Sequence, residues 1–181
     1  MNRSLKLIIA LVIALSLLTL LTNQWPWGLA QSQEINLIDN KYTWKPFRDA
    51  IISQNQSNLQ IVVVTNHTDE IYNRAFLPIQ INSALNKSFN LNLDYASQST
   101  KGNATFAAQI RDNTSQVADN SSSKVLSYIP LNNTNGQLSN ETFTIPSKIA
   151  NRPLELRLYV ITNGPGEHTL TVKKAGITIP P

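Results

Sequence analysis

Residues 154–177 read LELRLYVITNGPGEHTLTVKKAGI, and this stretch decides the fold. From Leu154 to Val160 an apolar side chain alternates with a polar or aromatic one. Successive side chains of a β-strand point to opposite faces, so the alternation predicts a strand with one buried and one solvated face. Asn163–Gly166 combines Asn, Gly and Pro as tight turns do. With a second strand over His168–Lys174, the pattern predicts a β-hairpin.

The same period of two recurs along the chain, at Phe89–Tyr95 and Ala104–Arg111. The β-branched run Ile61–Val64 predicts a central strand covered on both faces. Only Phe47–Ser53 predicts a helix, of about two turns. Shorter strands are predicted at Glu34–Ile38, Leu59–Thr65, Lys124–Leu131, Glu141–Ile145 and His168–Lys174. Eight or so short strands separated by turns predict an all-β fold, an antiparallel β-sandwich or barrel.

The N-terminus has the pattern of a targeting segment. Arg3 and Lys6 precede the apolar run LIIALVIALSLLTLL at residues 7–21, and residues 1–30 contain no acid. A basic start followed by an apolar run of this length is typical of a signal peptide, here with cleavage after Ala30. The alternative is an uncleaved membrane anchor helix formed by residues 7–27, with tryptophans at the headgroup level.

Both interpretations predict the same division of the chain. Residues 1–30 form a signal peptide or anchor, and residues 31–181 form a single extracytoplasmic β-sandwich domain, either secreted or held at the cell membrane.

Composition excludes several classes of protein. The chain has 181 residues, no cysteine, 15 basic and 11 acidic residues, and 21 asparagines. A disulfide framework, a thiol enzyme and an iron–sulfur protein all require cysteine. The net charge of +4 falls to +2 when Arg3 and Lys6 are set aside, and no cluster of basic residues is present. A nucleic acid is therefore not a predicted partner.

Asn-x-Ser/Thr triplets are more frequent than chance and fall in predicted turns or at strand ends. One interpretation is a glycosylated surface protein, because glycans attach to such triplets in exported chains. The other is that Asn and Ser are simply good turn residues. The candidate glycosylation sites are Asn55, Asn66, Asn86, Asn103, Asn113, Asn120, Asn132 and Asn140.

No catalytic motif emerges from the sequence. The two histidines, His67 and His168, belong to no metal-ligand pattern, and neither a nucleophile elbow nor a glycine-rich phosphate loop is present. We therefore predict a protein that is not an enzyme and that has no cofactor or metal. A structural calcium ion held by Asp39 and Asp94 has only weak support, because no calcium-loop motif surrounds them.

Ligand binding has better candidates than catalysis. Sugars bind to sandwiches through aromatic rings that stack on the pyranose and donors that fix its hydroxyls. Trp44 and Tyr72 are the predicted stacking rings, although each could equally pack over the end or a strand of the sandwich. The candidate ligand-binding residues, all placed in or near loops, are Tyr42, Trp44, Tyr72, Arg74 and Arg111.

The stretches 89–112, 141–146 (ETFTIP) and 154–177 together resemble the galactose-binding-like jelly rolls, a superfamily that includes many carbohydrate-binding modules. The shared order of elements is a long strand, a strand ending in I-x-D, an F-x-I-P strand, a turn containing glycine and a closing strand. The resemblance implies a jelly-roll β-sandwich that binds ligands in loops at one end or on its concave face.

Together these features predict a non-catalytic extracytoplasmic β-sandwich module that binds carbohydrate or another cell-surface ligand. The alternative is a structural subunit of a glycosylated surface layer, filament or membrane complex, whose exposed strand edges pair between subunits.

Overall fold

The computed structural model describes residues 32–81, 88–113, 125–146 and 153–179. These residues form strands and no helix, so they include no helix long and apolar enough to span a membrane. Residues 1–30, the predicted targeting segment, lie outside the described part. The strands are β1 (Gln33–Asn36), β2 (Lys45–Phe47), β3 (Ala50–Gln54), β4 (Leu59–Thr65), β5 (Glu70–Ile79), β6 (Ser88–Ser99), β7 (Asn103–Asp112), β8 (Val125–Pro130), β9 (Asn135–Thr144), β10 (Leu154–Asn163) and β11 (Gly166–Ile179).

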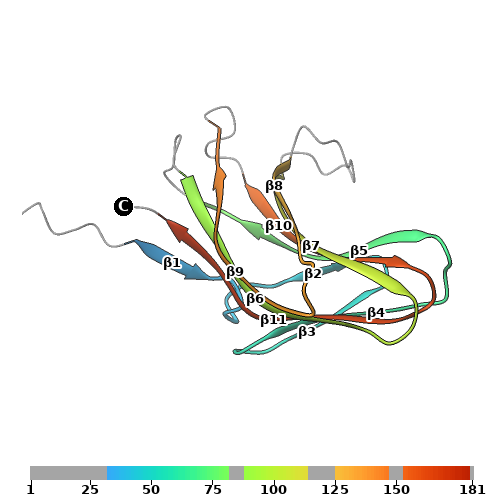
Figure 1. Cartoon of the computed structure of the whole chain (residues 1–181). Coiled ribbons are helices and arrows are strands. Elements are labelled where there is room, and N and C mark those ends of the chain that lie inside the picture. The colour runs from blue at the N-terminus through green and yellow to red at the C-terminus, as the bar shows by residue number, and fades with distance from the viewer. Residues whose placement is uncertain (1–31, 82–87, 114–124, 147–152, 180–181) are drawn as a thin grey trace, which may run out of the picture. The chain divides into compact units, whose positions relative to one another are not determined.

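The strands form two antiparallel sheets that stack face to face (Figure 1). Sheet A has the order β3-β4-β11-β6-β9, with β1 paired to the far end of β11, and sheet B has the order β2-β5-β10-β7-β8. From β4 onward the chain changes sheet at almost every connection, so each sheet pairs strands that are distant in sequence. This winding is that of a jelly roll, and the predicted antiparallel β-sandwich is confirmed.

The core lies between the sheets and is built from the inward half of each alternating strand. Leu154, Leu156, Leu158 and Val160 of β10 are at most 1% exposed, and they join one hydrophobic cluster with side chains of both sheets. Phe89 of β6 stacks on Phe143 of β9 at 5.5 Å between ring centroids. At roughly 25 cal/mol per Å² of apolar surface, this burial is the main stabilising term of a chain that contains no cysteine.

The hairpin predicted across Asn163–Gly166 is wrong, because β10 and β11 lie in different sheets. Strand β10 pairs with β5 and β7, whereas β11 pairs with β4 and β6. Gly164 has φ 125°, a conformation open mainly to glycine, and the turn carries the chain from one sheet to the other. Both strands have an apolar face, and stacking them in opposite layers buries both faces in one core.

Two further predictions about local structure are wrong. Phe47–Ser53 is not helical, since it contains the end of β2 and most of β3. The pairing Ile51↔Val62 and Ile52↔Ile61 shows why, because β-branched side chains pack well across adjacent strands. The run Ile61–Val64 is not covered on both faces, because Val64 is 59% exposed and β4 has one solvated side.

Strand β5 is the largest element that the sequence patterns missed. Tyr72 was expected in or near a loop, yet it belongs to this ten-residue strand, which is in full register with β10. The apolar positions of β5 alternate with Tyr, Arg and Phe, whose long side chains obscure the period of two. Every other predicted strand coincides with an observed one, though β9 and β11 are longer than expected.

Candidate ligand-binding site

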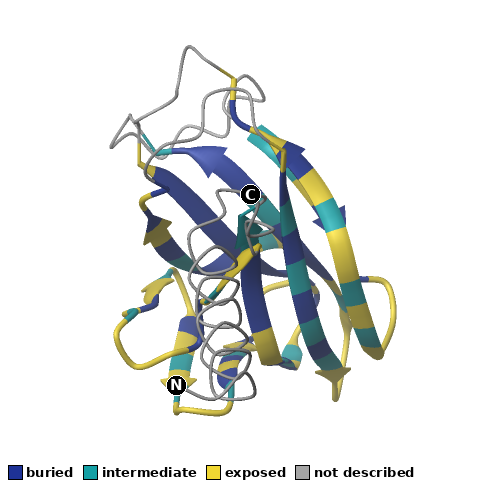
Figure 2. Cartoon of the chain, turned by 90° about the vertical axis from the view of Figure 1, so that its left-hand side faces the viewer, coloured by how far each residue is buried: buried dark blue, intermediate teal, exposed yellow. Residues whose placement is uncertain are grey.

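The outer face of sheet B carries a small hydrophobic cluster of its own. Because successive side chains alternate, Tyr159 and Ile161 of β10 point away from the core that Leu158 and Val160 help to form. Tyr159 and Ile161 are nevertheless 5% and 6% exposed, and they cluster with Ala107 of β7. Strand β10 is therefore buried on both faces. Figure 2 shows such strands as dark blue over most of their length.

A cavity of about 210 Å³ opens on this face, and we call it the tyrosine pocket. Tyr72 and Tyr128 are 39% and 53% exposed, whereas Tyr159 lies below them. The rings of Tyr72 and Tyr159 meet edge to face, with centroids 6.4 Å apart and planes at 89°. Four strands contribute to this lining, which consists of Tyr72, Gln109, Arg111, Tyr128, Tyr159 and Ile161.

A chain of polar contacts fixes the floor of the tyrosine pocket. Glu155 forms an ion pair with Arg157, and both side chains are nearly enclosed. Arg157 Nη1 donates to the hydroxyl of Tyr159 at 3.3 Å, and that hydroxyl donates to Gln109 Oε1 at 3.1 Å. The amide oxygen of Gln109 is thus occupied, and its NH₂ group makes no hydrogen bond to the described residues.

Arg74 lies beside the tyrosine pocket, and no carboxylate of the described residues forms an ion pair with it. It stands opposite Tyr159 in the β5–β10 register, and its Cζ atom is 3.8 Å from the ring centroid of Phe47 and 6.0 Å from that of Tyr159. The residue is 7% exposed, and its Nε atom is buried without a hydrogen-bond acceptor among the described residues. An arginine stacked in this way gains cation–π energy but remains without an anion.

The charges on this face perturb one another. Burial lowers the pKa of Arg74, and repulsion from Arg157 and Arg111 lowers it further. Burial also acts to lower the pKa of Arg157, but its bonds to Tyr159 and Glu155 outweigh that effect and raise it. A hydrogen bond with Glu70 is the main cause of the raised pKa of Tyr72.

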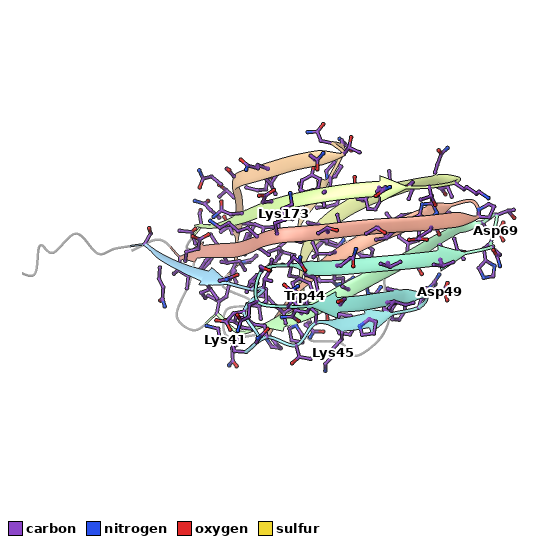
Figure 3. All side chains as sticks on the ribbon, turned by 90° about the horizontal axis from the view of Figure 1, so that it is seen from below. Lys41, Trp44, Lys45, Asp49, Asp69 and Lys173 are labelled. Atoms are coloured by element: carbon purple, nitrogen blue, oxygen red, sulfur yellow. The ribbon has the colours of Figure 1, made fainter. Side chains whose placement is uncertain are left out.

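The structure separates the predicted ligand-binding residues into two groups. Tyr72 and Arg111 line the tyrosine pocket, and Arg74 adjoins it. Trp44 is 4% exposed, and its indole N–H donates to the carbonyl of Leu37 at 3.0 Å, so its ring faces pack inside the sandwich. Tyr42 is half-buried against the same core. Figure 3 shows Trp44 within the fold and Lys41 and Lys45 at its margin.

Sequence reasoning missed four residues of the tyrosine pocket. Gln109 and Tyr159 were assigned to the solvated sides of strands, Tyr128 fell within a predicted strand, and Ile161 was given no role. The signal that identifies them is the period of two itself, because it places Gln109, Arg111 and Tyr159 on one face once β7 and β10 are known to pair. That pairing is not visible in the sequence.

The other predicted sites lie elsewhere in the molecule. Asn86 and Asn120 fall outside the described residues, Asn113 is half-buried, and the remaining candidate asparagines are exposed, namely Asn55, Asn66, Asn103, Asn132 and Asn140. The Asp39 carboxylate accepts a hydrogen bond from the Lys41 amide at 3.2 Å in a local turn. Asp94 borders a different hollow, with Glu34 and Lys174. Among the described residues no cluster of three or more His, Asp or Glu side chains is arranged to hold a metal ion.

Comparison with known proteins shows likeness of fold. No protein-family model matches the sequence, and neither does any curated protein. Among solved structures, the xylan-binding module CBM15 matches with a TM-score of 0.54 and 13% identity, over 82% of this chain and 97% of its own. A CBM4 structure matches with a TM-score of 0.50 and 14% identity, over 74% and 92% of the two chains. The predicted resemblance to carbohydrate-binding modules is therefore confirmed at the level of fold.

Proposed function

We propose that this protein is a non-catalytic carbohydrate-binding module whose ligand occupies the tyrosine pocket. The observation that carries the proposal is the convergence of Tyr72, Tyr128 and Tyr159 on one hollow beside Gln109 and Arg111. Two exposed aromatic rings on an otherwise well-covered face need an explanation, and stacking on sugar rings is the one that their chemistry favours.

The dimensions of the tyrosine pocket set what it can hold. Its volume of about 210 Å³ lies below the roughly 300–1,000 Å³ typical of sites for drug-sized ligands. One pyranose ring would enter, with its apolar face against Tyr72 or Tyr128, and the rest of a chain would lie along sheet B. The Gln109 NH₂ group is the donor for a sugar hydroxyl, since its oxygen is held by Tyr159.

Two further observations support a binding role without catalysis. The likeness in fold to a CBM4 structure and to a xylan-binding module supports such a role. On the outer face of sheet B, the ion pair of Glu155 with Arg157 keeps this carboxylate from acting as a free general acid or base.

The test is binding to an array of oligosaccharides, followed by calorimetry with the best ligand. The double variant Tyr72→Ala/Tyr128→Ala should weaken binding at least tenfold, because two stacking surfaces are lost. Ile51→Ala is the matched control, since it removes an exposed side chain from sheet A. Wild-type affinity in the double variant would exclude the tyrosine pocket as the site, and no binding by the wild type would exclude the function.

We further propose that the module works outside the cytoplasm. The support is the signal-like pattern of residues 1–30 together with exposed asparagines in glycosylation triplets. The intact mass of the native protein tests both points, because removal of residues 1–30 and attached glycans change it separately. An unmodified full-length mass in a cytoplasmic fraction would contradict the proposal.

A structural subunit of a surface layer is the second candidate, and an apolar patch on sheet A favours it. Ile51 and Val64 are 64% and 59% exposed, and β3 ends the order of its sheet. Such an edge can pair with a strand of another copy. Light scattering across a concentration series should then show association that Ile51→Lys abolishes. A monomer at every concentration would contradict this candidate.

A further inference from the structure

The outer face of sheet B has more cationic than anionic side chains. Its outward strand positions hold Arg74 on β5, Arg111 on β7 and Arg157 on β10, and Lys45 on β2 faces the same way opposite Phe76. Against these four cations stand only two acids at outward positions of the same strands, Glu155 and Glu70. A face with an excess of one sign of charge attracts ligands of the opposite sign.

The acids on this face are already engaged. Glu155 forms its ion pair with Arg157 and lies opposite Arg111 in the β7–β10 register. Glu70 stands at the other end of β5, where it raises the pKa of Tyr72. Among the described residues neither carboxylate forms an ion pair with Arg74, which lies beside the tyrosine pocket.

Arg74 is in the position where an anion would have the largest effect. It is flanked by two residues of the tyrosine pocket, with Tyr72 two positions away on the same side of β5 and Tyr159 opposite it on β10. Its guanidinium makes no hydrogen bond or ion pair with any described residue, and Nε is fully enclosed. A buried charge without a partner is costly, and a functional anion is a common reason to retain one.

We propose that the ligand of the tyrosine pocket is an acidic carbohydrate, whose carboxylate or sulfate group is bound by Arg74. This inference rests on the proposed function, because it names the class of sugar bound at the same site. The planar guanidinium presents parallel N–H donors to two oxygens of one oxyanion, which neutral sugars cannot exploit. The ring stacks on Tyr72 and Tyr128, and the acidic group points toward Arg74.

The test compares matched ligands by calorimetry at low and physiological salt. The probes are hexagalacturonate, its carboxyl-reduced form and a sulfated hexasaccharide. Hexagalacturonate should bind at least tenfold more tightly than the reduced form, and the difference should shrink as salt rises. The sulfated probe shows whether the site binds sulfate or carboxylate groups more tightly. Tighter binding of either acidic probe than of the carboxyl-reduced form supports the proposal.

Variants separate recognition from general attraction to a basic protein. Arg74→Gln should weaken binding of the acidic probe about tenfold, whereas Arg74→Lys should give an intermediate loss because it keeps the charge without the planar guanidinium. Lys173→Gln is the control, because it removes the same charge from an exposed position on sheet A (Figure 3). If Arg74→Gln does not fold, Arg74→Lys carries the comparison.

The outcomes distinguish this inference from the proposed function. Equal binding of acidic and reduced probes would overturn the inference and leave the carbohydrate-binding function standing. No binding of either would overturn both. Equal losses in Arg74→Gln and Lys173→Gln would show non-specific attraction and would also overturn the inference.

Discussion

Side chains alternate with the same period of two on both sheets, but the outer face of sheet A is largely exposed to solvent and much of the outer face of sheet B is buried. On sheet A the outward residues of β6 and β9 are half-buried or exposed amides and hydroxyls, such as Asn90 and Thr142, which hydrogen-bond at 3.0 Å. On sheet B the outward residues of β10 include Glu155, Arg157 and Tyr159, all at most 7% exposed. A polar pattern therefore predicts orientation within a strand, while burial depends on what stands on the neighbouring strands.

Side-chain length accounts for the difference. Asn, Thr and Ser are too short to cover one another across strands, so sheet A keeps a ladder of cross-strand hydrogen bonds open to water. Arg, Tyr and Phe lie along the sheet and cover adjacent strands with their apolar stems and rings. Sheet B thus buries charges on a face that sequence reasoning assigned to solvent.

The largest expected effect comes from removing one partner of an ion pair on each face. Glu155→Ala should lower the free energy of unfolding by about 3–5 kcal/mol, because it leaves the buried Arg157 charge unpaired. The matched change Glu34→Ala breaks an exposed pair with Lys174 at 2.9 Å and should cost only about 0–1 kcal/mol. Urea unfolding measures both. Equal losses would mean that the two faces do not differ as described.

Two isoleucines provide the apolar version of the same comparison. Ile161→Ala should destabilise the protein by about 2–5 kcal/mol, because this side chain is 6% exposed and packs with Ala107 and Tyr159. Ile51→Ala on sheet A should change stability by less than about 0.5 kcal/mol, since its side chain is 64% exposed. Thermal or urea unfolding of the pair is the measurement, and a small effect at Ile161 would show that the outer face of sheet B is not a packed layer.

Replacing Arg74 by an apolar residue removes a buried charge from sheet B without breaking an ion pair among the described residues. Arg74→Met should leave stability unchanged or raise it by about 1 kcal/mol, because the buried guanidinium has no carboxylate partner and its desolvation is uncompensated. The same variant should lose the preference for acidic sugars. Strong destabilisation would instead identify Arg74 as a structural residue of sheet B.

The smallest expected effect is a change in the titration of Tyr72. The hydrogen bond with Glu70 holds the phenol neutral above its ordinary pKa of 10.0, so Glu70→Gln should lower the pKa of Tyr72 toward that value. Because the folded-state pKa is raised, the related stability is present below pH 10.0 and is lost as the pH rises through the folded pKa. NMR of tyrosine-labelled protein resolves Tyr72 from the other four tyrosines. An unchanged titration would show that Glu70 does not control this ring.

Much of the fold was predictable from local pattern. The alternations at Phe89–Tyr95, Ala104–Arg111 and Leu154–Val160 became long strands, because a period of two needs no knowledge of distant residues. The short strand β3 was misassigned, since a few residues cannot distinguish a helix turn from an edge strand. The hairpin was wrongly predicted at Asn163–Gly166 because a turn signal does not say whether the two strands pair or stack.

The candidate site was predictable only in fragments. Tyr72, Arg74 and Arg111 were identified as aromatic and donor groups, yet the tyrosine pocket requires β5, β10, β7 and β8 to lie side by side. Trp44 has the most attractive side chain for sugar binding, but its indole packs in the core with its N–H on a backbone carbonyl. Burial of a single aromatic residue depends on tertiary neighbours that no local pattern reports.

The sequence by itself determined that residues 31–181 contain alternating strands and that asparagine and threonine take the place of charged residues on the solvated faces. It also determined that the fold contains no disulfide bond, because the chain has no cysteine. Only the tertiary structure decided which strands share a sheet, which polar face is buried, and where the tyrosines and arginines meet. The physical reason is that strand orientation follows from covalent geometry within a few residues, whereas strand pairing can join segments more than a hundred residues apart, as β1 and β11 are.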